Sequence, residues 1–339
     1  MRAPRPLLIV VAILLLAFIG FAVYWWIAVD RLRAGIVETR EQLAAFGIAV
    51  EHGEPEIGGS PSTLTLALPT PVGTRPGGPR IVGPEVLEGR VRLWNLESVS
   101  LEGPGRYELY LPQGDLLFET RDAVMTLELA GGLVDALSLR LADAAVTNRV
   151  TAQTLAAEKL SLSLERILPR PGGQDTAFAL QLEGLPLPAG ATETAAVMGE
   201  RIALLALAGR FEGPLFPGGE PRQIAAQWRD AGGILDLERI ALAWGRLGIS
   251  GAGTLTLDES FRPLGAFSLR TLGLPGLVAK LGESGVLDAE TAATLAAALD
   301  ARSEGTDDSG RTIVTLPMTA QDGVLTLGEV EVGPLRPLF

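Results

Sequence analysis

Apolar and polar residues alternate along most of this chain, from about residue 48 to the end. Leucine carries most of the alternation, as in TLTLAL (residues 63–68) and LSLSLE (residues 160–165). Successive side chains of a strand point to opposite faces of its sheet, so this period of two predicts half-buried antiparallel strands. The alternating segments are 64–68, 107–111, 125–129, 137–141, 160–164, 178–182, 240–244, 255–257 and 267–269. One large, curved antiparallel β-sheet is therefore expected over residues 48–339.

Apolar residues at helical spacing are confined to a few short segments of the β-rich region. The expected helices cover residues 191–199, 222–231, 275–282 and 289–301. The last two are expected to form a helical hairpin near the C-terminus, with Asp288 capping the second helix. The fold class predicted from the pattern is thus mainly β with a few helices.

Two segments of the predicted sheet share a sequence pattern. In residues 160–185 and in residues 237–274, apolar and polar positions alternate through a Glu-Arg-Ile sequence. A turn follows, and a second alternating stretch then continues into Gly-Leu-Pro. This similarity indicates a duplication, with a sheet built from two similar halves. A weak boundary at residues 213–221, which are rich in glycine and proline, would divide the domain.

The first residues break the alternation with an uninterrupted apolar run. LLIVVAILLLAFIGFAVYWWIAV (residues 7–29) contains no charge and lies between Arg5 and Asp30. At about 1.5 Å per residue, such a helix spans a hydrocarbon core of roughly 30 Å. Residues 1–29 are therefore predicted to be an N-terminal transmembrane anchor.

A cleaved signal peptide is the alternative to this anchor, because Gly20-Phe21-Ala22 offers a poor small-x-small cleavage site. Tyr24-Trp25-Trp26 favours retention, since aromatic residues gather at membrane interfaces. Arginines flank the run on both sides in nearly equal number. Its position at the extreme N-terminus favours an inside N-terminus, with the bulk of the chain outside the cytoplasm.

Residues 30–47 carry apolar positions at helical spacing, and Gly47 can end the helix. We expect the transmembrane helix to continue here as a membrane-proximal stalk. An interfacial or coiled-coil dimerisation helix is the alternative, but the apolar stripe covers fewer than three heptads, which favours the stalk.

Composition excludes several classes of function. The formal net charge is -12, and the basic residues are scattered among acidic ones, so no concentrated positive field is available for nucleic acid. The chain has no cysteine, which excludes disulfides, thiolate nucleophiles and cysteine-ligated zinc.

The candidate chemical groups are few, and each has a plainer interpretation. His52 is the only histidine, which excludes a histidine-pair metal site, and an exposed polar residue is the favoured interpretation over a general base. The segment 248–252 (GISGA) lacks the final glycine of a nucleophile elbow. Asp307 and Asp308 lie in a polar loop (304–310) whose spacing does not match a calcium loop. We predict no catalytic, cofactor-binding or metal-binding residue.

A set of glycine, tryptophan and aspartate positions gives the chain a family resemblance. The set consists of Trp228-Arg229-Asp230, Gly232-Gly233, Trp244-Gly245, Gly251, Gly253-Thr254-Leu255, Leu257-Asp258, Arg262-Pro263, Gly265-Ala266, Pro317, Asp322-Gly323, Leu325 and Leu327-Gly328. With it the chain resembles family 2125 of the domains of unknown function (DUF2125), anchored bacterial envelope proteins, over nearly all residues after the anchor. It departs at Arg246, where the pattern has proline, which affects one turn.

The resemblance implies the topology but brings no known activity or site residues. The motif Gly-x-Gly-Thr-Leu-x-Leu-Asp also gives the chain a more distant resemblance to β-rich AsmA-like envelope proteins, which are implicated in phospholipid traffic.

The anchor and the alternating leucines together lead to a function hypothesis. We expect a non-enzymatic, single-pass protein of the bacterial inner membrane, with its bulk in the periplasm, that binds or transfers a lipid or a lipidated partner in envelope maintenance. The alternative is an envelope scaffold that contacts another protein through a sheet edge or through residues 30–46. A hydrolase with a carboxylate pair in a cleft is the third hypothesis. Leucine faces that pack against each other at native density would weigh against the lipid hypothesis.

Overall fold

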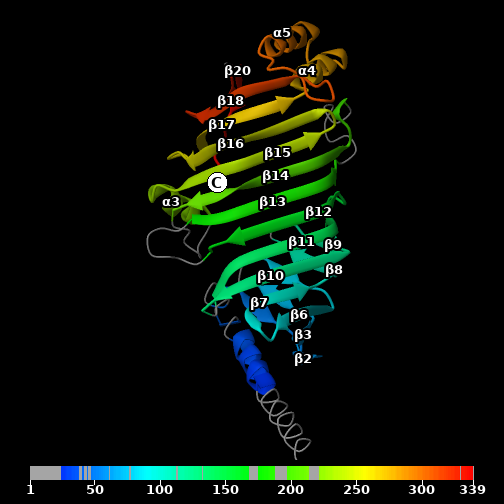
Figure 1. Cartoon of the computed structure of the whole chain (residues 1–339), viewed down its shortest axis with the longest axis vertical. Coiled ribbons are helices and arrows are strands. Elements are labelled where there is room, and N and C mark those ends of the chain that lie inside the picture. The colour runs from blue at the N-terminus through cyan, green and yellow to red at the C-terminus, as the bar shows by residue number, and fades with distance from the viewer. Residues whose placement is uncertain are drawn as a thin grey trace, which may run out of the picture.

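The structure is a computed structural model with one large, open antiparallel sheet that rises above a helix at the N-terminal side (Figure 1). It describes residues 24–338 except for positions 38–39, 42–43, 45–46, 61, 76–77, 112–113, 132, 168–174, 188–196, 214–220 and 329. The predicted mainly-β fold with a large antiparallel sheet is confirmed.

The larger part of the sheet is a meander in which each strand pairs with the next one along the chain. Its strands are β11 (Leu133–Asn148), β12 (Thr154–Glu165), β13 (Asp175–Pro186), β14 (Arg201–Glu212), β15 (Ile234–Trp244), β16 (Leu247–Leu257), β17 (Pro263–Leu272), β18 (Ile313–Gln321), β19 (Val324–Leu327) and β20 (Val330–Pro334). Strands β14 and β15 pair along their length, so the sheet continues across the expected boundary at 213–221.

The sheet forks at β11 into two branches. Residues 133–142 of this strand pair with β10, with one bulge, and residues 145–148 pair with β9, and Asp143 between them has a positive φ of 48°. The first branch runs through β10 (Asp122–Ala130), β7 (Asn95–Glu102), β6 (Val86–Arg92), β3 (Thr63–Pro69) and β2 (Glu56–Ser60). The second runs through β9 (Leu116–Thr120), β8 (Gly105–Tyr110), β5 (Arg80–Val82), β4 (Val72–Thr74) and β1 (Ala49–Glu51). The sequence did not predict this fork.

The helices of the β-rich region lie close to their expected positions. They are α3 (Pro221–Asp230), α4 (Leu274–Glu283) and α5 (Ala289–Asp300). The last two lie side by side at the far end of the sheet (Figure 1). Asp288 caps α5, as predicted, because its side chain accepts a hydrogen bond from the Thr291 amide at 2.8 Å. Of the expected helix 191–199, residues 191–196 lie outside the described part, and 197–198 are helical.

Residues 24–37 form a helix that continues past residue 29 into the expected stalk, and positions 40, 41 and 44 are also helical. The predicted membrane span (7–29) lies outside the described residues up to position 23. In the part of the chain that the structure describes, no helix has the length and apolar character needed to cross a membrane. The anchor and the internal duplication therefore stay predictions.

The curled sheet depends on glycine where neighbouring strands approach closely. A Cβ added to Gly253 would lie 2.4 Å from the Ala266 carbonyl oxygen and 2.4 Å from Cδ1 of Phe267. Gly253→Val is therefore expected to destabilise the domain by about 1–3 kcal/mol, because β16 and β17 must separate. Urea unfolding measures this. Ala252→Val, at an exposed neighbouring position, should stay within about 0.5 kcal/mol of the parent, and equal losses for the two variants would contradict the close approach.

Candidate functional site

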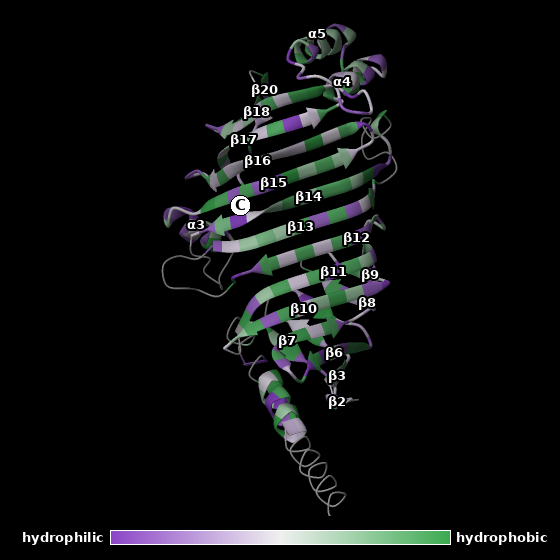
Figure 2. Ribbon diagram, viewed as in Figure 1, coloured by the Kyte–Doolittle hydropathy of each residue, from purple (hydrophilic) through white to green (hydrophobic). Residues whose placement is uncertain are grey.

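The pairing register aligns mainly apolar positions of the sheet into rows that cross its strands. The first row contains Met125, Leu139, Leu162, Leu180, Leu207, Ile240, Gly251, Leu269 and Leu316. The second contains Ala123, Leu141, Leu160, Leu182, Leu205, Leu242, Ile249, Thr271 and Val314. We call these rows the leucine face. Figure 2 shows the underlying alternation of apolar and polar residues along the strands.

The opposite face of the same strands carries small and polar side chains. Its residues include Ser138, Arg140, Ser161, Ser163, Ala179, Gln181, Ala206, Ala208, Arg239, Ser250, Ala252 and Ser268. Each lies one position from a residue of the leucine face. The two sides of the sheet therefore differ in chemistry, as the period of two predicts.

The N-terminal helix packs on the same side of the sheet, beside the leucine face. Ala28 is only 1% exposed and belongs to a cluster with Leu64, Val91 and Leu93. Trp25, Val29 and Leu32 pack against the same cluster, and the Tyr24 hydroxyl donates a hydrogen bond to the Leu93 carbonyl. Val91, Val99, Leu127 and Leu137 follow one another in register beside the first row. The helix therefore docks on the apolar side of the sheet.

The second branch covers part of the leucine face. Phe118 of β9 packs, together with Leu139 and Leu160, against the buried residues Ala123, Leu141 and Ala144. The Tyr107 ring lies 5.5 Å from the Phe118 ring, and its hydroxyl donates to the Gly103 carbonyl at 2.5 Å. Partial burial raises the pKa of Tyr107. The fork thus encloses the end of the leucine face that lies nearest the helix.

Between the fork and β17, the leucine face is only partly shielded, whereas Leu269, Val314 and Leu316 at its far end are buried. Leu162, Leu180, Leu207 and Ile240 are half-buried. In the described part of the chain, Leu64 and Val314 are the only large side chains that are fully buried. A packed core would bury many such side chains at native density. The middle of the leucine face is therefore not a sealed core, and this surface is the candidate site.

A surface charge cluster joins the second branch to the end of β11. Glu108 accepts a hydrogen bond from the Tyr110 hydroxyl at 2.5 Å and pairs with Arg149 at 2.8 Å and Arg106 at 3.0 Å. The Tyr110 and Arg149 hydrogen bonds lower the pKa of Glu108, while Glu108 raises the pKa of Tyr110. Because this cluster connects strands away from the leucine face, a structural role accounts for it.

Trp228, Arg229 and Leu257, which belong to the family resemblance, form a packed corner with Phe261 at one end of α3. Trp228 is buried with Leu257 and Phe261, and its indole N–H donates to the Glu212 carbonyl at 3.0 Å. The Arg229 guanidinium lies 4.8 Å from the centre of the Phe261 ring. These contacts hold the β16–β17 turn against the helix, so this part of the pattern marks packing.

The structure places the remaining sequence candidates apart from one another. His52 Nδ1 lies 2.7 Å from the carbonyl oxygen of the adjacent Gly53, and Ser250 is exposed in the middle of β16. Within the described residues, no group of three or more acidic or histidine side chains could hold a metal ion. The leucine face carries none of these groups.

Asp307 closes a turn, and Asp258 closes a second turn with the same hydrogen bonds. Asp307 accepts hydrogen bonds from the amides of Ser309 (3.0 Å) and Arg311 (2.8 Å) and from Arg311 Nε (2.8 Å). Asp258 makes the equivalent bonds to Ser260 and Arg262. Both turns read Asp-acidic-Ser-x-Arg. The Asp307 carboxylate thus caps a turn.

This cap predicts a pH dependence of stability. The Arg311 amide and guanidinium hold the pKa of Asp307 below its usual 3.8. A lowered folded-state pKa stabilises the fold above the unfolded value, and this contribution disappears as the pH falls through the folded value. Asp307→Asn should therefore flatten the loss of stability between about pH 5 and about pH 2 in urea titrations. Asp308→Asn is the control, and an unchanged slope in Asp307→Asn would contradict the cap.

Comparison with known proteins gives one match. A family model described as "Uncharacterized protein conserved in bacteria (DUF2125)" matches residues 25–336. No curated protein and no solved structure matches the chain significantly. The matched range includes the docked helix, both branches and the meander. The likeness to AsmA-like proteins stays a prediction.

Proposed function

We propose, from the premise that this chain belongs to the DUF2125 family of uncharacterised bacterial proteins, that it binds acyl chains on its leucine face. In this proposal it is a non-enzymatic protein of the inner membrane, held there by residues 1–29, with the sheet in the periplasm. It accepts or hands on a lipid or a lipidated partner during envelope maintenance.

The observation that carries this proposal is the continuity between the docked helix and the apolar rows. Ala28 packs on Val91, and from Val91 the register leads through Val99 and Leu127 into the meander. An acyl chain leaving the bilayer beside this helix would meet apolar surface from the first strands onward. Each methylene that it buries contributes about 0.8 kcal/mol.

The dimensions of the sheet suit this role. Neighbouring strands lie roughly 4.8 Å apart, so the half-buried part of the rows, from β12 to β16, extends for about 19 Å. Half of a hydrocarbon core is about 15 Å. The leucine face is therefore long enough to hold an entire acyl chain outside the membrane.

The docked helix also refines the proposed anchor. Because residues 25, 28, 29 and 32 pack on the sheet, the uncharged segment left for the bilayer is 7–23. Its seventeen residues would extend about 26 Å as a helix, at the short end of the range for a transmembrane span. The sheet would then stand directly at the membrane surface.

Lipid retention tests the proposal. The full chain is purified in mild detergent, and its bound lipids are extracted and identified by mass spectrometry. We expect retained phospholipid in the parent and a severalfold loss in Leu162→Glu, because a carboxylate on the apolar row must be desolvated by the acyl chain. Ser163→Glu adds the same charge on the opposite face of β12 and should retain lipid. A parent that copurifies with no lipid would overturn the proposal.

Protein scaffolding is the second candidate function. The edge strand β20 pairs with β19, and within the described residues no strand pairs with its other side. Its Val330 is 51% exposed, and an open edge can accept a strand from another protein. Crosslinking in cells that gave one dominant protein adduct at β20 would favour this function.

A further inference from the structure

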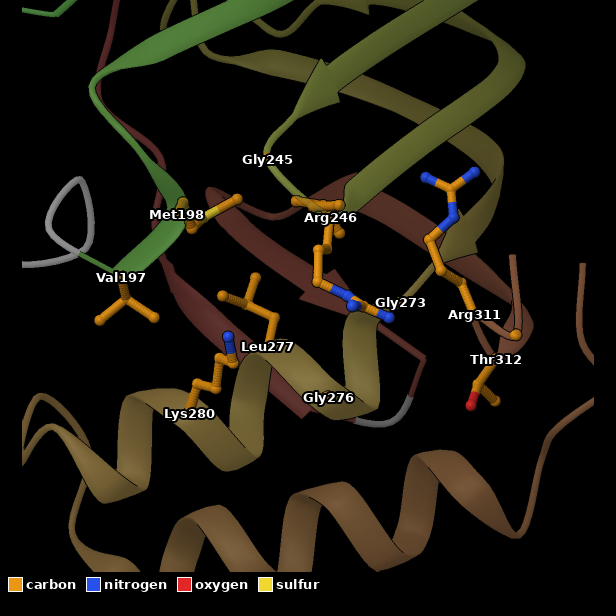
Figure 3. A pocket seen from close by; sticks show the side chains of 12 residues that line it. Val197, Met198, Gly245, Arg246, Gly273, Gly276, Leu277, Lys280, Arg311 and Thr312 are labelled. Atoms are coloured by element: carbon orange, nitrogen blue, oxygen red, sulfur yellow. The ribbon is translucent and has the colours of Figure 1, made fainter.

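A cavity of about 330 Å³ lies at the far end of the sheet, away from the fork (Figure 3). It is formed by the β15–β16 turn, by α4 and by the segment that precedes β18. The described residues that line it are Val197, Met198, Gly245, Arg246, Leu247, Gly273, Gly276, Leu277, Lys280, Gly310, Arg311 and Thr312. Its volume is at the small end of the usual range for ligand pockets, about 300–1,000 Å³.

The cavity is positively charged, although the whole chain has a net charge of -12. Its ionisable lining residues in the described part are Arg246, Lys280 and Arg311. Arg311 is neutralised by Asp307, which its guanidinium meets at 2.7 Å. Arg246 and Lys280 form no hydrogen bond or ion pair with another described side chain. Two positive charges are therefore uncompensated.

Figure 3 shows how these side chains are arranged. Arg246 extends from the β15–β16 turn toward Gly273, and Lys280 rises from α4 on the same side, beside Leu277, whereas the Arg311 guanidinium points away from both. The two uncompensated cations come from elements 34 positions apart in the chain. Both side chains line the same cavity.

The backbone around Arg246 is held in place by tight glycine contacts. Gly273 has a φ of 76°, and a Cβ there would lie 2.7 Å from the Arg246 carbonyl oxygen. Gly245 has a φ of 55°, and a Cβ there would lie 2.2 Å from the Met198 carbonyl oxygen. Both positions require glycine. The turn is therefore packed closely against the start of α4, which fixes the base of the Arg246 side chain.

We propose that this cavity binds a phosphate group carried on a small organic molecule. A guanidinium and an ammonium are the side-chain groups that bind phosphate through charge-assisted hydrogen bonds. The apolar lining from Val197, Met198, Leu247 and Leu277 suits an organic substituent better than a bare ion. The site is distinct from the leucine face and does not depend on acyl-chain binding there.

The phosphate could come from a lipid headgroup or from a soluble phosphate ester, and two measurements distinguish these sources. The full chain in phosphatidylcholine nanodiscs is titrated with glycerol 1-phosphate by calorimetry. In parallel, the chain in nanodiscs that contain phosphatidylglycerol is analysed by native mass spectrometry for retained anionic lipid. Calorimetric binding identifies a soluble ester, and preferential retention of phosphatidylglycerol alone identifies a headgroup.

Single substitutions test the residues. Arg246→Gln and Lys280→Gln should each weaken binding by about tenfold or more, because each removes one charge-assisted hydrogen bond. Arg140→Gln, at an exposed position on β11, makes the same charge change far from the cavity and should bind like the parent. The proposal is overturned if neither probe binds the parent, if both cavity variants bind like the parent, or if Arg140→Gln weakens binding equally. Lipid bound on the leucine face should be unaffected by all three variants.

Discussion

Replacing Ala28 by aspartate is expected to detach the helix of residues 24–37 from the sheet. Ala28 is 1% exposed between Leu64, Val91 and Leu93, so a carboxylate at this position would be buried without a partner. The effective cost of such burial is several kcal/mol. A cost of about 3 kcal/mol already lowers the docking equilibrium more than a hundredfold.

Hydrogen–deuterium exchange of the full chain measures this detachment. Residues 63–66 and 90–93 should exchange faster in Ala28→Asp, because the helix no longer shields them. Ala34→Asp is the matched control, since Ala34 lies on the same helix and is exposed. Parent-like protection in Ala28→Asp would show that the helix does not depend on this contact. If the helix guides acyl chains to the leucine face, Ala28→Asp should also retain less lipid.

Truncating Trp228 to alanine is expected to cost about 3–5 kcal/mol of the free energy of unfolding. Trp228 is buried with Leu257 and Phe261, and its indole N–H satisfies the Glu212 carbonyl. The variant would leave a cavity and an unpaired carbonyl at the same corner. The Arg229 guanidinium over the Phe261 ring would lose its support there as well.

Chemical denaturation monitored by circular dichroism checks this loss. Trp94→Ala removes the same side chain at a position that is 70% exposed, and should change the free energy of unfolding by less than about 1 kcal/mol. Similar losses in the two variants would mean that the corner does not hold α3 to the sheet. Phosphate binding at the α4 cavity, which is formed by other elements, should survive in Trp228→Ala under native conditions.

The two proposed sites differ in whether a sequence pattern predicts them. The leucine face follows from a period of two repeated over successive strands, and the meander brings these strands together in chain order. The cavity joins a turn at Arg246 to a helix at Lys280, and no sequence pattern indicated that these residues would meet. The departure of Arg246 from the proline of the family pattern was the one signal in the sequence at this place.

The sequence by itself determined the features that depend on near neighbours. Alternation from residue 48 onward predicted the strands and the apolar side of the sheet, because the pleat assigns successive side chains to opposite faces. Helical spacing and a capping aspartate at Asp288 predicted the hairpin of α4 and α5. These signals are local, so they can be recognised without a three-dimensional arrangement.

Only the tertiary structure decided which surfaces meet. The fork at Asp143, the docking of Ala28 on Val91 and the cover that Phe118 provides all join residues that are distant in the chain. Hydropathy could not distinguish the docked residues 25–29 from the rest of the apolar N-terminal run. An apolar side chain has the same hydropathy whether it contacts lipid or an apolar face of the sheet. The physical reason is that apolar attraction has no direction, so the backbone geometry of the sheet selects the partner.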